Sequence, residues 1–198
     1  MGKTALVYEL AARAIEAILE QADRIRRVVR GFLDLARGDA PALADLPPAE
    51  VLRGAVALVE HRFGGDGVAL RVVVADDLPA IHCDVLMLQQ ALVNLLLNAR
   101  DACKGGGRVE AALHSDGERV VFTVTDDGVG ITPEHAARAT EPFFTTKPAG
   151  QGTGLGLAIA SEIAKMHRGA LSIQPASPRG TCASVILPRA SKQREAAA

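Results

Sequence analysis

Two segments with alternating apolar residues, 109–114 and 119–125, are separated by a turn at Asp116-Gly117. Asp-Gly between alternating segments is typical of a β-hairpin, so these two strands are expected to pair in antiparallel fashion. Periodicity and breaker residues predict the remaining elements: helices at 49–63, 84–103 and 153–167, and strands at 68–74, 170–174 and 182–187. This order of helices and antiparallel strands favours an α+β fold, a two-layer α/β sandwich, over a doubly wound sheet.

The composition excludes several classes of protein. The 198 residues include 22 Lys and Arg against 23 Asp and Glu, and aromatic residues make up 3%. Such a chain is not expected to bind nucleic acid, because nucleic-acid binders are usually basic and stack bases on aromatic rings. No apolar run reaches the roughly 20 residues that span a bilayer, and Met1 opens no signal-peptide pattern. Three scattered cysteines, Cys83, Cys103 and Cys182, fit a reducing compartment. These features predict a cytoplasmic globular protein.

Residues 1–38 are predicted to form one long helix. Apolar residues between positions 11 and 36 recur at alternating spacings of four and three. That heptad rhythm is typical of a coiled-coil or bundle helix. Prolines mark residues 39–48 as a linker, which leaves 49–190 as the main domain, and the polar residues 191–198 are expected to be a disordered tail.

The predicted helix 84–103 carries polar residues on one face. Asp84 is a good N-cap residue, and Gln90, Asn94, Asn98 and Asp101 follow at spacings of four, four and three, so they line one face. Asparagine is a mediocre helix former, and an amide oxygen in a cleft can bind Mg²⁺ beside phosphate and water. A solvated outer face explains the same pattern, and the helix alone leaves both readings open.

Two glycine-containing segments could bind a ligand. Residues 126–130, Asp-Asp-Gly-Val-Gly, end a strand, where an acid can accept an N–H while glycines let a flat ligand approach; a simple Asp-Gly turn is the alternative. Residues 150–157 open the last predicted helix, whose N–H groups can bind phosphate. The Rossmann pattern does not fit, because Leu155 and Leu157 stand where its third glycine belongs, and the Gly-Lys-Thr at 2–4 lacks the rest of a P-loop.

Taken in order, these elements resemble the GHKL (Bergerat) ATP-binding fold, and most closely that of sensor histidine kinases. The matching boxes are QALVNLLLNARDA at 90–102, DDGVG at 126–130, EPFFTTK at 141–147, GTGLGL at 152–157 and GT at 180–181. The FFTTK wording is similar to the nitrogen-regulation branch of these kinases. The resemblance covers residues 48–188 and implies a histidine kinase-like ATPase sandwich preceded by one long bundle-type helix.

The resemblance implies that the protein binds ATP or ADP together with Mg²⁺. Asp126 would accept the adenine amino group, and Thr181 would support Asp126 from the neighbouring strand. Gly128, Gly130 and Ile131 would lie close to the adenine ring.

The resemblance also implies a site for the phosphates. Asn98 would ligate Mg²⁺, Asp101 would help hold the waters of the metal, and Asn94 would contact the phosphate or the attacking group. Lys147, in a mobile lid of residues 143–152, would contact phosphate, so that Asn94 and Lys147 are the expected catalytic residues. The expected phosphate cradle consists of Gly152, Thr153, Gly154, Leu155 and Gly156.

One part of the kinase pattern is missing. Such kinases phosphorylate a histidine in a helical hairpin, and none of the five histidines has that setting: His61, His82, His114, His135 and His167. Helix 1–38 resembles the second helix of the hairpin, so we expect either a piece of a larger kinase or a natural protein without an acceptor.

The implied reaction is phosphoryl transfer from Mg-ATP to a histidine on another segment and then to a response regulator. The implied partners are the nucleotide, the histidine-bearing helix of the parent kinase, a receiver domain, and a second copy bound through the hairpin. A GHKL ATPase is one alternative, although such enzymes place a glutamate base where this chain has Asn94. A non-catalytic nucleotide-binding regulator is the other.

Overall fold

The computed structural model describes residues 41–64, 67–103, 105–148 and 152–190. The chain divides after residue 38 into two units, and all described residues belong to the second. The helix expected at 1–38 and the tail expected at 191–198 lie outside the described residues, so both stay predictions. Within the described part, no helix has the length and apolar character needed to cross a membrane.

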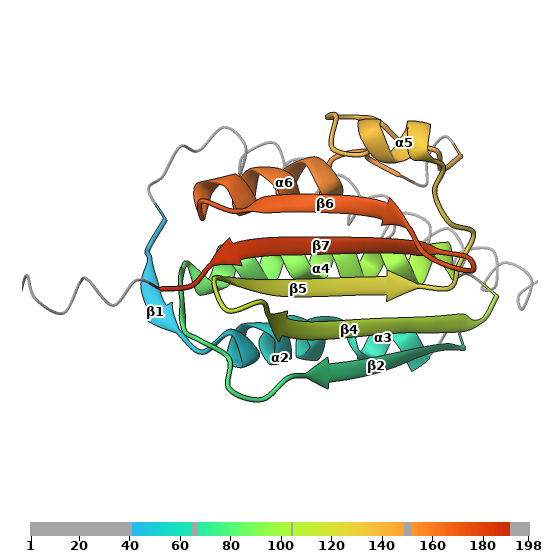
Figure 1. Ribbon diagram of the computed structural model, residues 1–198. Coiled ribbons are helices and arrows are strands. Elements are labelled where there is room, and N and C mark those ends of the chain that lie inside the picture. The colour runs from blue at the N-terminus through green and yellow to red at the C-terminus, as the bar shows by residue number, and fades with distance from the viewer. Residues whose placement is uncertain (1–40, 65–66, 104, 149–151, 191–198) are drawn as a thin grey trace, which may run out of the picture. The chain divides into compact units, whose positions relative to one another are not determined.

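A five-stranded sheet forms one layer (Figure 1). Its order is β2 (Val68–Val74), β4 (Gly107–Ser115), β5 (Arg119–Asp126), β7 (Thr181–Pro188) and β6 (Ala170–Pro175). The β4–β5 hairpin is antiparallel as predicted, with Val109 opposite Asp126. Strand β2, whose direction the sequence does not indicate, runs parallel to β4 with Val68 opposite Gly107, so the sheet is mixed. A long helix separates these two strands, and such a crossover returns the chain to the same end of the sheet.

Three helices form the second layer on one face of the sheet (Figure 1). The central helix α4 (Val85–Ala102) contacts both α2 (Pro48–Val59) and α6 (Gly156–Met166). Alternate residues of β4 and β5 are buried beneath these helices, and Phe122 is fully buried. The two-layer α/β sandwich predicted from the sequence is confirmed.

Helix α4 begins where the sequence predicts. The Asp84 side chain accepts hydrogen bonds from the backbone N–H groups of Leu86 and Met87 at 3.0 and 3.1 Å, which satisfies two donors at the start of the helix. The N–H of Asp84 itself donates to Nε2 of His167 at 2.9 Å. His167 is 3% exposed and its Nδ1 lies 2.7 Å from the carbonyl of Ile163. His167 therefore connects the end of α6 to the start of α4.

Short elements appear where the sequence predicts only linkers and loops. Strand β1 (Ala44–Leu46) lies in the predicted linker and pairs antiparallel with β3 (Ile81–Cys83). The helix predicted at 49–63 is divided in two in the structure. Helix α2 ends at Val59, and a separate helical turn, α3 (His61–Gly64), follows it. Helix α5 (Pro133–Arg138) interrupts the loop after β5, and α6 begins at Gly156, three residues later than predicted. Elements of three to six residues are too short to show a period.

Candidate functional site

The polar face of α4 lies against the start of α6 rather than against solvent. Asn94, Asn98 and Asp101 are all half-buried. The Asn94 side-chain amide donates to the carbonyl of Gly156 at 3.2 Å, and Gly156 has only hydrogen for a side chain where the two asparagines approach it. The alternative of a solvated outer face is therefore excluded by the packing.

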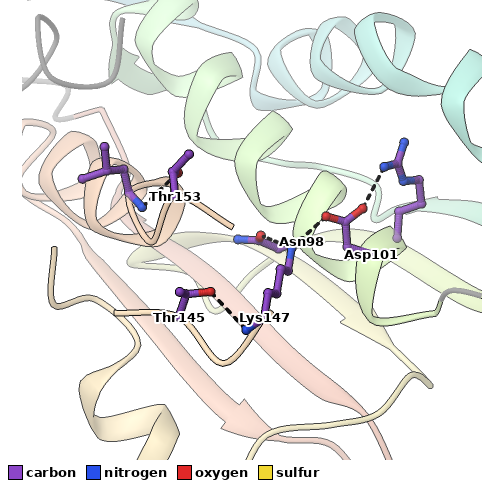
Figure 2. A network of polar contacts seen from close by, with 7 residues as sticks. Asn98, Asp101, Thr145, Lys147 and Thr153 are labelled. Carbon is purple, nitrogen blue, oxygen red and sulfur yellow. Dashed lines mark hydrogen bonds and ion pairs between the residues drawn. The ribbon is translucent and has the colours of Figure 1, made fainter. Parts of the chain in front are cut away.

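Asp101 binds a cation through each of its carboxylate oxygens (Figure 2). Arg100 donates to Oδ1 at 2.7 Å, and the Lys147 ammonium donates to Oδ2 at 2.7 Å. Burial alone would raise the pKa of Asp101, but the hydrogen bonds and charges of Lys147 and Arg100 outweigh it and hold the pKa below its ordinary value. Asp101 therefore carries a negative charge at neutral pH.

The Lys147 ammonium also reaches Asn98. Its Nζ atom lies 3.5 Å from Oδ1 of Asn98, a longer contact than the one to Asp101 (Figure 2). The side chain of Lys147 is 32% exposed and that of Asp101 is 20% exposed. The expected phosphate ligand and the two expected metal-site residues thus meet in one network, although Lys147 and Asp101 are 46 positions apart.

Close packing of two glycines positions the segment that carries Lys147. Phe143 donates its N–H to the carbonyl of Gly154 at 2.9 Å, and a Cβ at Gly154, whose φ is +66°, would clash with the Phe143 backbone. A Cβ at Gly152 would lie 2.6 Å from Oγ1 of Thr145, the atom that accepts the Lys147 N–H at 3.2 Å (Figure 2). Only glycine allows the two segments to approach so closely.

The first turn of α6 follows this segment directly. Thr153 accepts the N–H of Leu155 through its hydroxyl at 3.3 Å (Figure 2). Leu155 is 3% exposed, so its side chain is an apolar anchor for this turn. Because the first N–H groups of any helix lack helical partners and sit at the positive end of the dipole, this turn suits an anion.

Asp126 forms the other end of the candidate site, at the end of β5. It is 5% exposed, and its Oδ1 atom accepts the N–H groups of Gly128 and Thr181 at 3.0 and 3.3 Å. The sheet register sets Thr181 directly opposite Asp126. Burial raises the pKa of Asp126 above its ordinary value, and the two backbone hydrogen bonds oppose this rise. Both backbone bonds end on Oδ1, and the Thr181 side chain also hydrogen-bonds to this carboxyl group.

The residues after Asp126 are held by contacts that the sequence reasoning missed. The Asp127 carboxylate accepts the N–H of Arg108 at 2.7 Å. The Arg179 guanidinium donates twice to the Asp127 carbonyl, at 3.0 and 2.8 Å. A lone arginine in a turn gives no sequence signal for this role. These contacts thus fasten the turn after Asp126 to β4 and to the turn that precedes β7.

Two glycines of this turn are required by the fold itself. A Cβ at Gly128 would clash with the Ala102 backbone at the end of α4, and Gly130 has a φ of +80°. Ile131 is half-buried in a shallow hollow between residues 129–132 and 175–180. Their expected approach to an adenine ring stays a prediction.

The donor set bears on which metal could bind here. Among the described residues, no three His, Cys, Asp or Glu side chains are grouped as metal ligands. The site offers the carboxylate of Asp101 and the amide oxygen of Asn98, both hard oxygen donors that suit Mg²⁺. An ion held by so few protein oxygens needs phosphate oxygens and waters to complete its shell, so the residues fit a metal that accompanies a nucleotide.

Comparison with known proteins assigns the family. The family described as histidine kinase-, DNA gyrase B-, and HSP90-like ATPase matches residues 83–191, more than half of the chain. The chain therefore belongs to this family of ATPases.

Two curated relatives are sensor or sporulation kinases. The sensor histidine kinase ZraS of Salmonella typhimurium is 32% identical over 189 residues, covering 95% of this chain and 39% of ZraS. Sporulation kinase E of Bacillus subtilis is 29% identical over 172 residues, covering 86% of this chain and 23% of that kinase. The chain thus spans well under half the length of these relatives.

Solved structures agree in fold. Full-length ShkA in complex with AMPPNP has a TM-score of 0.78 and 30% identity, covering 91% of this chain and 39% of ShkA. The histidine kinase ThkA in complex with the response regulator protein TrrA has a TM-score of 0.77 at 21% identity, covering 92% of this chain and 52% of ThkA. Within the ATPase family, the chain is similar to the catalytic domains of histidine kinases.

Proposed function

We propose that this chain is the ATP-binding catalytic portion of a sensor histidine kinase. It transfers a phosphoryl group from Mg-ATP to a histidine on a segment outside the described residues, and the group then passes to a response regulator. The observation that carries the proposal is the presence of two groups at opposite ends of one site. A buried carboxylate, Asp126, lies at one end, and the network of Asn98, Asp101 and Lys147 lies at the other. The nucleotide analogue named for ShkA and the regulator named for ThkA support the partners.

In this proposal Asp126 reads the base. Its Oδ1 atom is engaged by Gly128 and Thr181, so Oδ2 accepts the exocyclic amino group of adenine. Guanine carries an oxygen at the equivalent position and would face the carboxylate with an acceptor. Gly128, Gly130 and Ile131 border the ring, and the Arg179 contact keeps the turn in place.

The phosphates lie at the start of α6 in this proposal. The backbone of residues 152–156 offers N–H groups, and Lys147 supplies an ammonium group. Asn98 and the waters held by Asp101 bind Mg²⁺, and Asn94 contacts the transferred phosphoryl group. Bound Mg²⁺ neutralises charge on the phosphate oxygens. The protein residues position and neutralise the reacting groups, which is the main requirement of phosphoryl transfer.

Asn94 favours transfer over hydrolysis. An amide cannot take a proton from water, and its Nδ2 atom already donates to Gly156. Asp101 is paired with two cations and its pKa is lowered, so it is a poor base as well. These two observations favour a kinase over an ATPase of the gyrase type.

The acceptor histidine must come from elsewhere. All five histidines are among the described residues, and each lies outside an acceptor box: His82 pairs with Asp45 at 2.6 Å, His135 packs on Phe144, and His167 is buried. We propose that residues 1–38 are the second helix of the acceptor hairpin, that residues 39–48 link it to the catalytic domain at 49–190, and that the parent protein dimerises through the hairpin. Free, buried Cys83 and Cys103 support a cytoplasmic location.

The test mixes the chain with labelled ATP, Mg²⁺ and a histidine-bearing hairpin from a related kinase. An acid-labile, base-stable phosphate on the hairpin supports the proposal. For variants at Lys147 the matched control is Lys165→Met, which removes a lysine on α6 that pairs with Glu162 outside the site. Nucleotide binding without transfer to any hairpin would favour the non-catalytic regulator.

A further inference from the structure

The expected metal site already holds a cation of the protein itself. The Lys147 ammonium lies 2.7 Å from Oδ2 of Asp101 and 3.5 Å from Oδ1 of Asn98. These two oxygens are the ones proposed above to organise Mg²⁺ and its waters. Figure 2 shows the lysine side chain extending from residues 145–147 to this oxygen pair on α4.

The charges around the oxygen pair disfavour the binding of a free metal ion. Arg100 occupies Oδ1 of Asp101 and Lys147 occupies Oδ2, so two positive side chains surround one carboxylate. The three side chains together carry a net charge of +1. Such a cluster repels a lone divalent cation and attracts a polyphosphate, because half-buried charges are poorly screened by solvent.

We propose that Lys147 is an internal counter-ion that makes metal entry conditional on the nucleotide. Without nucleotide, its ammonium group neutralises Asp101 and blocks the oxygens of Asp101 and Asn98. When the nucleotide binds, its phosphate oxygens bind the Lys147 ammonium group. The oxygens of Asp101 and Asn98 are then free to bind the metal ion that accompanies the phosphates. The site thereby selects the metal–nucleotide complex over the free metal. This inference rests on the proposed nucleotide function.

The segment that carries Lys147 is built to place the ammonium there. Phe143 is hydrogen-bonded to Gly154, and Thr145 holds the Lys147 backbone N–H. The phosphate cradle and the counter-ion therefore belong to one packed unit. A ligand at residues 152–154 would be adjacent to the segment that must release Asp101.

Metal binding without nucleotide tests the proposal directly. The probe is Mn²⁺, which replaces Mg²⁺ at oxygen sites and can be counted by electron paramagnetic resonance. The full chain and its Lys147→Met variant are titrated with Mn²⁺, first alone and then with saturating ADP. We expect the Lys147→Met variant to bind Mn²⁺ in the absence of ADP about tenfold or more tightly than the wild type, because one repelling charge is gone. Lys165→Met removes the same charge elsewhere on the surface and is expected to leave Mn²⁺ binding unchanged.

A double-mutant cycle gives a second readout that needs no metal. The affinity for ATP is measured by calorimetry in EDTA for the wild type, Lys147→Met, Asp101→Asn and the double variant. In the wild type, the lysine must leave Asp101 to bind phosphate, so its removal has a small effect. In the Asp101→Asn background its removal is expected to cost about tenfold more affinity, the size of an ordinary coupling between contacting charged residues.

Two results would overturn the inference. The first is Mn²⁺ binding in the absence of ADP that is equally tight in the wild type and in Lys147→Met while both proteins still bind Mn-ADP, and the second is additivity in the double-mutant cycle. These results leave the proposed function standing, because Mn-ADP binding is retained. Failure of every variant and of the wild type to bind Mn-ADP would instead refute the nucleotide function and the inference with it.

Discussion

Replacing Asp126 by asparagine should separate nucleotide recognition from folding. The substitution Asp126→Asn keeps the shape of the side chain, and its carbonyl oxygen can still accept the N–H groups of Gly128 and Thr181. The atom facing the base changes from a charged acceptor to an NH₂ donor. The adenine amino group is also a donor, so one charge-assisted hydrogen bond is lost.

The magnitude follows from that lost bond. Hydrogen bonds to charged groups contribute about 1.5–3 kcal/mol, so ATP affinity should fall by about 10- to 150-fold at about 1.4 kcal/mol per factor of ten. GTP should not lose affinity, because its base oxygen can accept from the new NH₂ group. Wild-type protein should prefer ATP, and the variant should lose this preference.

The stability of the Asp126→Asn variant, unlike its ATP affinity, should not fall. Burial raises the pKa of Asp126 above its ordinary value, so the folded state holds the proton more tightly than the unfolded state. The contribution of this group to stability is therefore complete below the unfolded pKa and is lost as the pH rises through the folded pKa. At neutral pH the ionised, buried carboxylate is a cost that asparagine avoids, and the thermal midpoint of Asp126→Asn should equal or exceed that of the wild type.

Calorimetry with ATP and GTP, together with thermal unfolding, checks both expectations. The control is Asp77→Asn, which removes a carboxylate at an exposed turn after β2 and should change neither quantity. The ratio of the two ATP dissociation constants, variant to wild type, should also shrink as the pH falls towards the raised pKa of Asp126, since protonated aspartate is neutral like asparagine. Equal affinity of the wild type for ATP and GTP, or full ATP affinity in the variant, would refute the reasoning.

Three further outcomes are expected. Asn98→Ala should abolish phosphoryl transfer to a supplied hairpin and reduce the Mg²⁺ dependence of nucleotide binding, measured with labelled ATP and by calorimetry with and without the metal; retained transfer would discard the metal role. The chain alone should neither keep a label from ATP nor hydrolyse ATP quickly, because Asn94 withholds the general-base help that is worth about 10²–10⁴-fold; rapid steady-state hydrolysis that is lost on Asn94→Ala would contradict this. Gly154→Ala should weaken nucleotide binding and lower the thermal midpoint, because its Cβ would clash with the facing backbone at a positive φ; Gly117→Ala also has a positive φ but open space around it, so an equal loss of nucleotide affinity in both variants would refute the packing argument.

Much of the fold follows from local sequence patterns. The β4–β5 hairpin was readable from alternation around Asp116-Gly117, and the start of α4 from the capping residue Asp84. Helix α5 also has a local signal in the sequence, because Thr132 caps it and Pro133 occupies its first turn. The pairing of β1 with β3 has no such signal, since three residues make no period.

The sequence by itself determined which residues could do chemistry. It set Asn94, Asn98 and Asp101 on one face of α4 and Asp126 at the end of a strand, because helix and strand periods depend only on neighbours along the chain. The family resemblance added that these residues serve a nucleotide.

Only the tertiary structure decided which of these residues meet and in what state. It paired β2 with β4 in parallel, opposed Thr181 to Asp126, and brought Lys147 onto Asp101 across 46 positions of the chain. It also showed that Gly128 and Gly154 are required by neighbouring backbone. Such contacts depend on the summed packing of elements distant in sequence, and no local pattern records which distant charge will lie beside a given carboxylate.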